Sequence, residues 1–253
     1  MSADALVADL ARRLDARANP STREWWNRYL KGSIEFRGVP MAGVRAAVHD
    51  LWNEHRLDEL HREEQLDLVL ALFAQPHAED KLAAILALAE ILIDELRLPD
   101  VSFLAEPFAR AYVADWSTCD WYCVKALARF LERGDDREAR ARALAAWRDA
   151  PTVWQRRAAA VSFVQLAKRG DVALPGLANL VLDVCATNAH DPERFSQTSV
   201  GWVLRELSHA EPERVAAFVD EHEHLLSREA YRMATAKLPP ELRATRNPAG
   251  LRR

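Results

Sequence analysis

The sequence contains few of the residues that form tight turns and disulfides. Glycine occurs 8 times and proline 12 times in 253 residues. Sandwiches and barrels need many such turns, so the composition argues against an all-β fold. Three cysteines are too few, and too odd in number, for a disulfide framework, and free thiols are typical of a reducing cytosol.

Long hydrophobic runs and an excess of one charge are also missing. The longest apolar stretch, residues 82–96, is interrupted by Glu90, Asp94 and Glu95. It falls short of the roughly 18 apolar residues of a membrane span. The first twenty residues carry both charge signs and no apolar core, unlike a signal peptide. We therefore expect a soluble cytoplasmic protein with no membrane partner.

The charge balance limits the class of partner. There are 34 basic and 38 acidic residues, which gives a net charge of −4. This excludes a simple polybasic nucleic-acid binder but leaves room for a local basic face. No apolar seam is left over for a large oligomer interface, so we expect a monomer.

The sequence is rich in helix signals. Alanine, leucine, arginine and glutamate dominate, and all four favour helix. Apolar residues recur three or four positions apart, as in Leu66, Val69, Leu70 and Phe73, and no long window alternates with a period of two. Evenly spaced breaks predict ten or more helices.

Several helix starts are also predicted. Thr152 and Ser227 have the sequence context of N-caps, and residues 21–24 that of a capping box. Pro192 and Pro212 are predicted at the first helical position, where a missing N–H costs nothing.

Three tryptophans suggest a repeat. Trp116, Trp154 and Trp202 are each expected near a helix start, at separations of 38 and 48 residues. HEAT and armadillo helix pairs repeat at roughly 40 to 47 residues. The sequence therefore predicts an all-α, HEAT-like solenoid with a concave face. We expect one repeat domain over residues 1–245 and a basic, frayed tail over residues 246–253.

Familiar catalytic, metal-binding and phosphate-binding motifs are absent from the sequence. The sequence has no glycine-rich phosphate loop, no HExxH and no GxSxG. Cys119 and Cys123 lack a second pair and are interpreted as core residues. His222 and His224 point to different faces of a helix. We expect neither a metal nor a cofactor.

The pair Trp116 and Asp120 is a candidate site. The two side chains are four residues apart and so share one helical face. A carboxylate among aromatic residues is costly unless it is paired or used. Two interpretations stay open from the residues alone: an aspartate paired with a neighbouring arginine, and a functional carboxylate.

Local positive charge gives a second signal. Residues 154–170 contain four basic residues and no acidic one, and residues 227–253 contain seven basic and two acidic. Such stretches fit either a phosphate-binding strip or a solvated helix face. Arg156, Arg157, Lys168 and Arg228 lie in these stretches and are candidates for binding phosphate.

Five segments, in order along the chain, carry a family resemblance. They are Tyr29–Gly38, Trp116–Asp120, Trp154–Arg157, Gly201–Glu206 and Ser227–Ala230. At these positions the chain resembles the AlkD-like family of DNA alkylation repair glycosylases, which are built from HEAT-like helix pairs. Asp115, before Trp116, departs from the aromatic residue that many members have there, and an extra carboxylate could alter activity.

The resemblance implies a function and roles for the residues. It implies a DNA glycosylase that removes cationic N3- or N7-alkylated purines from double-stranded DNA. Asp120 would be the catalytic carboxylate, Trp116 and Trp202 would hold the damaged nucleoside, and Arg157 would lie beside them. With the resemblance included, we expect a DNA-binding set formed by Tyr29, Lys31, Arg156, Arg157, Lys168, Arg205 and Arg228. The alternative is a non-catalytic HEAT-like scaffold that binds DNA or a protein partner, because a solenoid face is a general binding surface.

Overall fold

The structure is a computed structural model that describes residues 2–243 of the chain. Every regular element in this range is a helix; the one β-type pairing is an isolated bridge between Glu35 and His77. The all-α class is therefore confirmed. The predicted tail over residues 246–253 lies outside the described residues. The single repeat domain over residues 1–245 and its concave face stay predictions.

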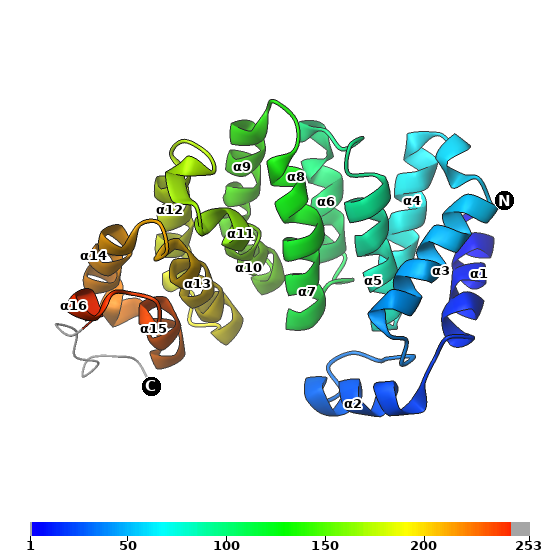
Figure 1. Cartoon of the computed structure of the whole chain (residues 1–253), viewed down its shortest axis with the longest axis horizontal. Helices are drawn as coiled ribbons and strands as arrows, with labels where there is room; N and C mark the ends of the chain where they lie inside the picture. Colours follow the sequence, from blue (N-terminus) through cyan, green and yellow to red (C-terminus); the bar gives the residue numbers. More distant parts are fainter. Residues whose placement is uncertain (1, 244–253) are drawn as a thin grey trace. The chain divides into compact units, whose positions relative to one another are not determined.

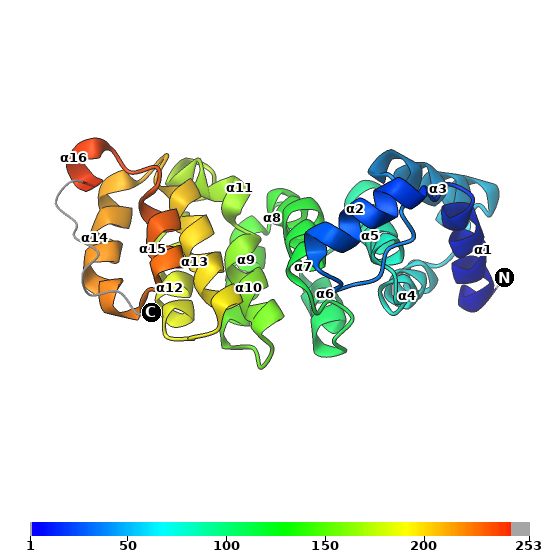
Figure 2. The same cartoon turned by 90° about the horizontal axis from the view of Figure 1, so that it is seen from below.

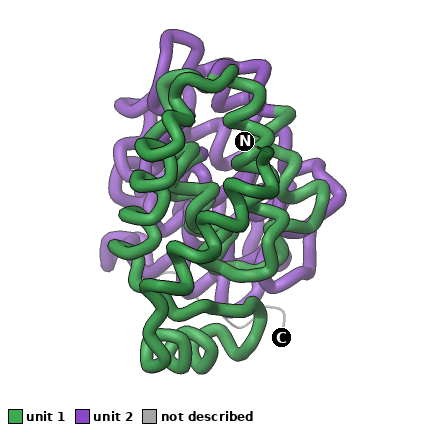
Figure 3. Tube along the Cα trace, turned by 90° about the vertical axis from the view of Figure 1, so that its right-hand side faces the viewer, with its two compact units in different colours: residues 1–96, 102–126 green, residues 97–101, 127–253 purple. Residues whose placement is uncertain are grey.

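The chain divides into two compact units, drawn in different colours in Figure 3. Unit 1 comprises residues 1–96 and 102–126, and unit 2 comprises residues 97–101 and 127–253. The helices that carry unit 1 are α1 (Ala3–Asp15), α2 (Pro20–Leu30), α3 (Met41–Glu54), α4 (Arg62–Phe73), α5 (Ala78–Leu86), α6 (Val101–Ala109) and α7 (Trp116–Tyr122). A π-helical turn over Ala87–Ile91 continues α5.

The described part of unit 2 is also built from helices (Figure 1). Its helices are α8 (Ala128–Glu132), α9 (Arg137–Ala145), α10 (Val153–Val161), α11 (Val164–Ala167), α12 (Leu177–Ala189), α13 (Arg194–Leu207), α14 (Pro212–His222), α15 (Arg228–Thr235) and α16 (Pro240–Arg243). A second π-helical turn, Cys123–Leu127, precedes α8.

Aliphatic and aromatic side chains fill the core of each unit. In unit 1, Leu10, Leu51, Leu72, Phe73 and Tyr122 are almost completely buried. In unit 2 the fully buried set includes Phe130, Phe163, Val184, Cys185 and Leu204. All three cysteines are buried and unbridged, which confirms the free thiols and the core positions of Cys119 and Cys123.

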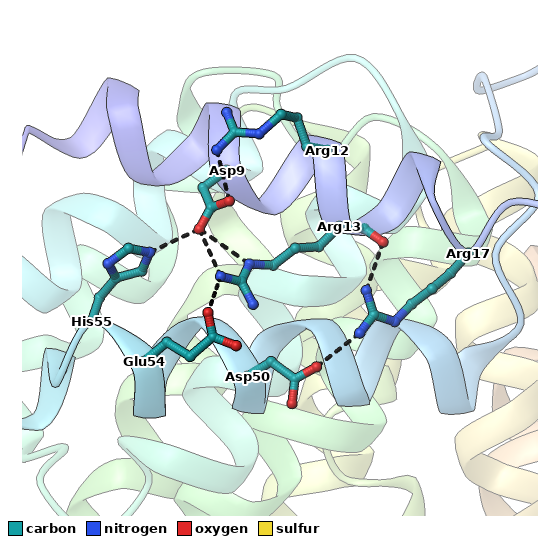
Figure 4. A network of polar contacts seen from close by, with 7 residues as sticks. All are labelled: Asp9, Arg12, Arg13, Arg17, Asp50, Glu54 and His55. Atoms are coloured by element: carbon teal, nitrogen blue, oxygen red, sulfur yellow. Dashed lines mark hydrogen bonds and ion pairs between the residues drawn. The ribbon is translucent and has the colours of Figure 1, made fainter.

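An ion-pair network ties α1 to α3 in unit 1 (Figure 4). The Asp9 carboxylate accepts hydrogen bonds from Arg12, Arg13 and His55. These bonds, with His55 contributing most and Arg13 next, lower the pKa of Asp9. Arg13 also donates to Glu54 at 2.6 Å, so one cation joins carboxylates from both helices.

The helix starts test the capping predictions. The Thr152 hydroxyl accepts from Gln155 N at 3.3 Å and the Ser227 hydroxyl from Ala230 N at 3.1 Å, so both N-caps are confirmed. Pro212 begins α14 as predicted.

Three details of the prediction were wrong. Helix α2 begins at Pro20 and is capped by Asn19, whose side chain accepts from Ser21 N at 2.9 Å, so residues 21–24 are inside the helix. Helix α13 begins at Arg194 and not at Pro192, because Asp191 accepts from Glu193 N and holds that turn outside the helix. Trp202 lies in the second half of α13 and not near its start.

Candidate functional site

Helix α7 presents the aromatic and carboxylate pair predicted from the sequence. Asp115 is its N-cap: the buried carboxylate accepts a hydrogen bond from Thr118 N at 2.9 Å. Trp116 is the first residue of the helix, and Asp120 follows one turn later. Both side chains are half-buried and lie on one face of α7. The extra carboxylate at position 115 therefore has a capping role in the helix that carries Asp120.

Tyr29 contacts Trp116. Their ring centroids are 5.8 Å apart at an angle of 67°, an edge-to-face geometry. Figures 1 and 2 show α2 lying apart from the paired helices of unit 1, at the end where α7 begins. The fold thus brings Tyr29 into contact with Trp116, on the helix that carries Asp120. Lys31 ends α2 with a left-handed φ of 53° and is exposed.

Helix α2 also carries aromatic residues that the sequence analysis missed. Trp25 stacks on Tyr29, with ring centroids 5.2 Å apart, and Trp26 stacks on Phe36 at 5.3 Å. The signal was available: Trp25 and Tyr29 are four residues apart and so share a helical face.

A small pocket lies between α2, α5 and α7 within unit 1. Its cavity volume is about 60 Å³, enough for a few water molecules. Pockets that enclose a ligand measure roughly 300–1,000 Å³. It therefore offers no enclosed space for a purine. The lining residues are Trp26, Phe36, Val39, Met41, Ala78, Glu79, Leu82, Ser117, Thr118 and Trp121.

Glu79, at the edge of this pocket, fixes the segment that follows α2. Its carboxylate accepts hydrogen bonds from the backbone N–H groups of Arg37, Gly38 and Val39 at 2.9, 2.8 and 3.0 Å. The Arg37 guanidinium in turn donates to the fully buried Asp80. Burial raises the pKa of Asp80, although Arg37 opposes this shift. These bonds hold Phe36 in place behind Trp26.

Unit 2 holds the other predicted residues. Trp202 is half-buried on α13. Arg157, on α10, is buried and donates to Phe195 O at 2.8 Å and to Thr198 Oγ1 at 3.0 Å. Its guanidinium also lies 6.0 Å from the Phe195 ring centroid. Arg157 therefore joins α10 to the first turns of α13.

Most of the predicted basic strip is neutralised by the fold. Arg156 donates twice to Asp191, at 2.9 and 2.8 Å, and Arg169 is paired with Glu132 at 2.7 Å. The sequence window lacked acidic residues, but neighbouring helices supply them.

Glu206 supplies a further carboxylate to this strip. Arg205 donates to it at 2.7 Å, and Lys168 lies 3.9 Å from it. Arg228, by contrast, is exposed at the start of α15, and residues 2–243 provide no carboxylate partner for it. Arg228 is therefore available to a phosphate group.

The glycine at position 201, in the segment Gly201–Glu206, is required by the packing of α13 against α15. A Cβ atom at this position would lie 2.7 Å from Ala230 O and 2.9 Å from Met233 Cβ. Only glycine lets α13 approach α15 this closely. This close backbone contact with α15 fixes the position of α13, the helix that also carries Trp202.

The described residues contain no group of histidine, cysteine, aspartate or glutamate side chains that could hold a metal ion. Within the same part of the chain, none of the helices has the length and apolar character to cross a membrane.

The described residues form an all-helical protein, and a comparison with family models identifies its family. A model of the family "DNA alkylation repair enzyme" matches residues 10–238. The chain therefore belongs to the DNA alkylation repair enzyme family.

A solved structure shares the fold. The chain is similar to a predicted DNA alkylation repair enzyme from Enterococcus faecalis, with a TM-score of 0.73 and 21% identity. The match covers 88% of this chain and 98% of that one. None of the curated proteins matches the sequence.

Proposed function

We propose that this protein is a monofunctional DNA glycosylase that hydrolyses the N-glycosidic bond of cationic N3- or N7-alkylated purines. The observation that supports it most is the pairing of Trp116 and Asp120 one turn apart on α7, with Tyr29 packed edge-on against Trp116. A half-buried carboxylate on the same helix face as an indole ring is suited to a positively charged transition state.

The chemistry needs few groups. Alkylation at N3 or N7 leaves the purine positively charged, so it departs without being protonated by an acid. The sugar then develops oxocarbenium character, which a nearby carboxylate stabilises. Asp120 would perform this role and orient the attacking water. The Trp116 ring attracts a cationic base or sugar through cation–π interaction, worth roughly 0.5–2 kcal/mol.

The small volume of the pocket behind α7 supports handling of the lesion at the protein surface. Trp202 of unit 2 would provide the second aromatic face, as the resemblance implies. Arg157 would lie beside the damaged nucleoside, as the resemblance implies. We expect Lys31 and Arg228 to contact phosphates directly, because both are exposed cations. The partner is double-stranded DNA, and the protein acts as a monomer without a cofactor.

Base release from methylated duplex DNA tests the proposal. Wild-type protein is expected to release 7-methylguanine or 3-methyladenine, and Asp120→Asn is expected to lose at least about 100-fold in rate while still binding DNA. Asp67→Asn is the matched control, because Asp67 is an exposed carboxylate on α4 of the same unit. Equal release by wild type and Asp120→Asn would refute the assignment of Asp120.

The pairing of Arg156, Arg169 and Arg205 with carboxylates favours a second candidate, a non-catalytic scaffold for a protein partner. The salt dependence of DNA affinity separates the two, since phosphate contacts produce a steep negative slope. A shallow slope, together with no base release by the wild type, would support the scaffold for a protein partner.

A further inference from the structure

Two aromatic rings on α2 are exposed and stacked on each other. The side chains of Trp25 and Tyr29 are 53% and 55% exposed. Their planes differ by only 11°. In the described part of the chain, Val172 is the one other large hydrophobic residue with comparable exposure. Clustered exposed hydrophobic residues mark binding sites more often than isolated ones do. We refer to Trp25 and Tyr29 as the aromatic platform.

The aromatic platform is held from beneath. Trp26 contacts Trp25 edge-on at 4.7 Å and Tyr29 at 6.0 Å. Trp26 itself packs on the buried cluster of Leu30, Phe36 and Ala78. This cluster occupies the space beneath α2, so the two exposed rings remain at the surface, pre-ordered for a partner.

Two unpaired cations stand close to the platform in the chain, one two residues before Trp25 and one two residues after Tyr29. Arg23 and Lys31 are both exposed, and neither has a carboxylate partner among residues 2–243. Arg28 differs, because Glu24 neutralises it at 2.8 Å. A symmetric dimer through this face would bring like charges together. A flat aromatic ligand that carries phosphate groups is complementary to both features.

We propose that the aromatic platform binds an unpaired nucleobase of DNA by stacking. A fully paired duplex exposes base faces only at its ends, whereas a base displaced from the duplex offers one to Trp25. Lys31, on the left-handed residue that ends α2, would hold an adjoining phosphate. Because Tyr29 also contacts Trp116, the base held there is one close to the proposed reaction site. This inference rests on the DNA binding in the proposed function, and not on its chemistry.

Fluorescence of a 2-aminopurine base tests the inference, with excitation outside the tryptophan band. Two duplexes are compared: one carries the probe as a single unpaired nucleotide, and the other carries it in a base pair. The wild type is expected to bind the unpaired form roughly 10-fold more tightly and to quench the probe, since stacking of one base accounts for such a ratio. Trp25→Ala is expected to lose both effects, and Trp25→Phe to keep most of each.

Asn27→Ala is the control, because Asn27 is exposed on the same helix but on another face. It should behave as wild type, and circular dichroism shows whether each variant is folded. The inference is overturned if the wild type has no preference for the unpaired base or if folded Trp25→Ala keeps it. A dimer that Trp25→Ala converts to monomer overturns it as well.

The base-release assay keeps this inference separate from the proposed function. Base release without a preference for the unpaired probe would overturn the platform and leave the glycosylase proposal intact. A preference that depends on Trp25, without base release, would support the platform and overturn the glycosylase proposal.

Discussion

The ring of Tyr29 packs edge-on against the ring of Trp116, with centroids 5.8 Å apart. This contact joins α2, which carries exposed aromatic and basic residues, to α7, which carries Asp120. The two residues are far apart in the sequence. Glu79 fixes residues 37–39, which follow α2, by accepting three backbone hydrogen bonds. The arrangement gives unit 1 both a candidate reacting group and a candidate DNA-binding surface.

The capping role of Asp115 leads to a prediction about charge. Asn caps a helix as well as Asp does, so Asp115→Asn should retain both stability and base release, whereas Asp115→Ala should lose about 1 kcal/mol of unfolding free energy. Denaturant unfolding and the base-release assay measure the two properties. A folded Asp115→Asn variant without activity would show that the Asp115 carboxylate acts in the reaction.

The close approach at Gly201 predicts the sign of the stability change in a Gly201→Ala variant. In an open helix, Gly→Ala stabilises by up to about 1 kcal/mol. At Gly201, the added methyl group would collide with Ala230 of α15, so Gly201→Ala should destabilise the protein by about 2 kcal/mol. Thermal or urea unfolding decides the matter, and a stabilised variant would contradict the close approach of α13 and α15.

The Asp9 network leads to a prediction about acid stability. The pKa of Asp9 is lowered in the folded protein, mainly by His55 and then by Arg13. Its contribution is therefore complete above the unfolded pKa, near 3.8, and disappears as the pH falls through the folded pKa.

The corresponding variant is Asp9→Asn. It should lower the unfolding free energy by about 1 kcal/mol near neutral pH, after allowance for solvent screening, and by much less in strong acid. Urea titrations of both proteins across the acidic range measure the difference. A deficit that stays constant with pH would contradict this account.

The presence or absence of a carboxylate partner predicts which cations govern the salt dependence of DNA binding. Lys31 and Arg228 have no carboxylate partner within residues 2–243, so Lys31→Ala and Arg228→Ala should each reduce the salt slope by about 0.9. Arg156 is already bound to Asp191, and Arg156→Ala should leave the slope nearly unchanged. Fluorescence anisotropy at several salt concentrations gives the slopes. The opposite ranking would mean that DNA displaces Asp191.

Local sequence determined the helical class and many helix ends. Apolar spacing of three and four residues predicts helices from neighbouring positions. The caps Thr152 and Ser227 and the first-turn Pro212 likewise act within one helical turn, so the helix starts that they set can be predicted from the adjacent sequence. The pairing of Trp116 with Asp120 follows from helical geometry in the same way. The family resemblance of five short segments agrees with the family match over residues 10–238.

Only the tertiary structure decided which side chains from distant segments contact one another. Residues 154–170 look basic in sequence, but Asp191, Glu132 and Glu206 neutralise much of their charge. Tyr29 meets Trp116, and Ala230 forces glycine at position 201, because helices remote in sequence pack together. Charge pairing and steric contact depend on distances in space, and the order of residues along the chain does not contain them.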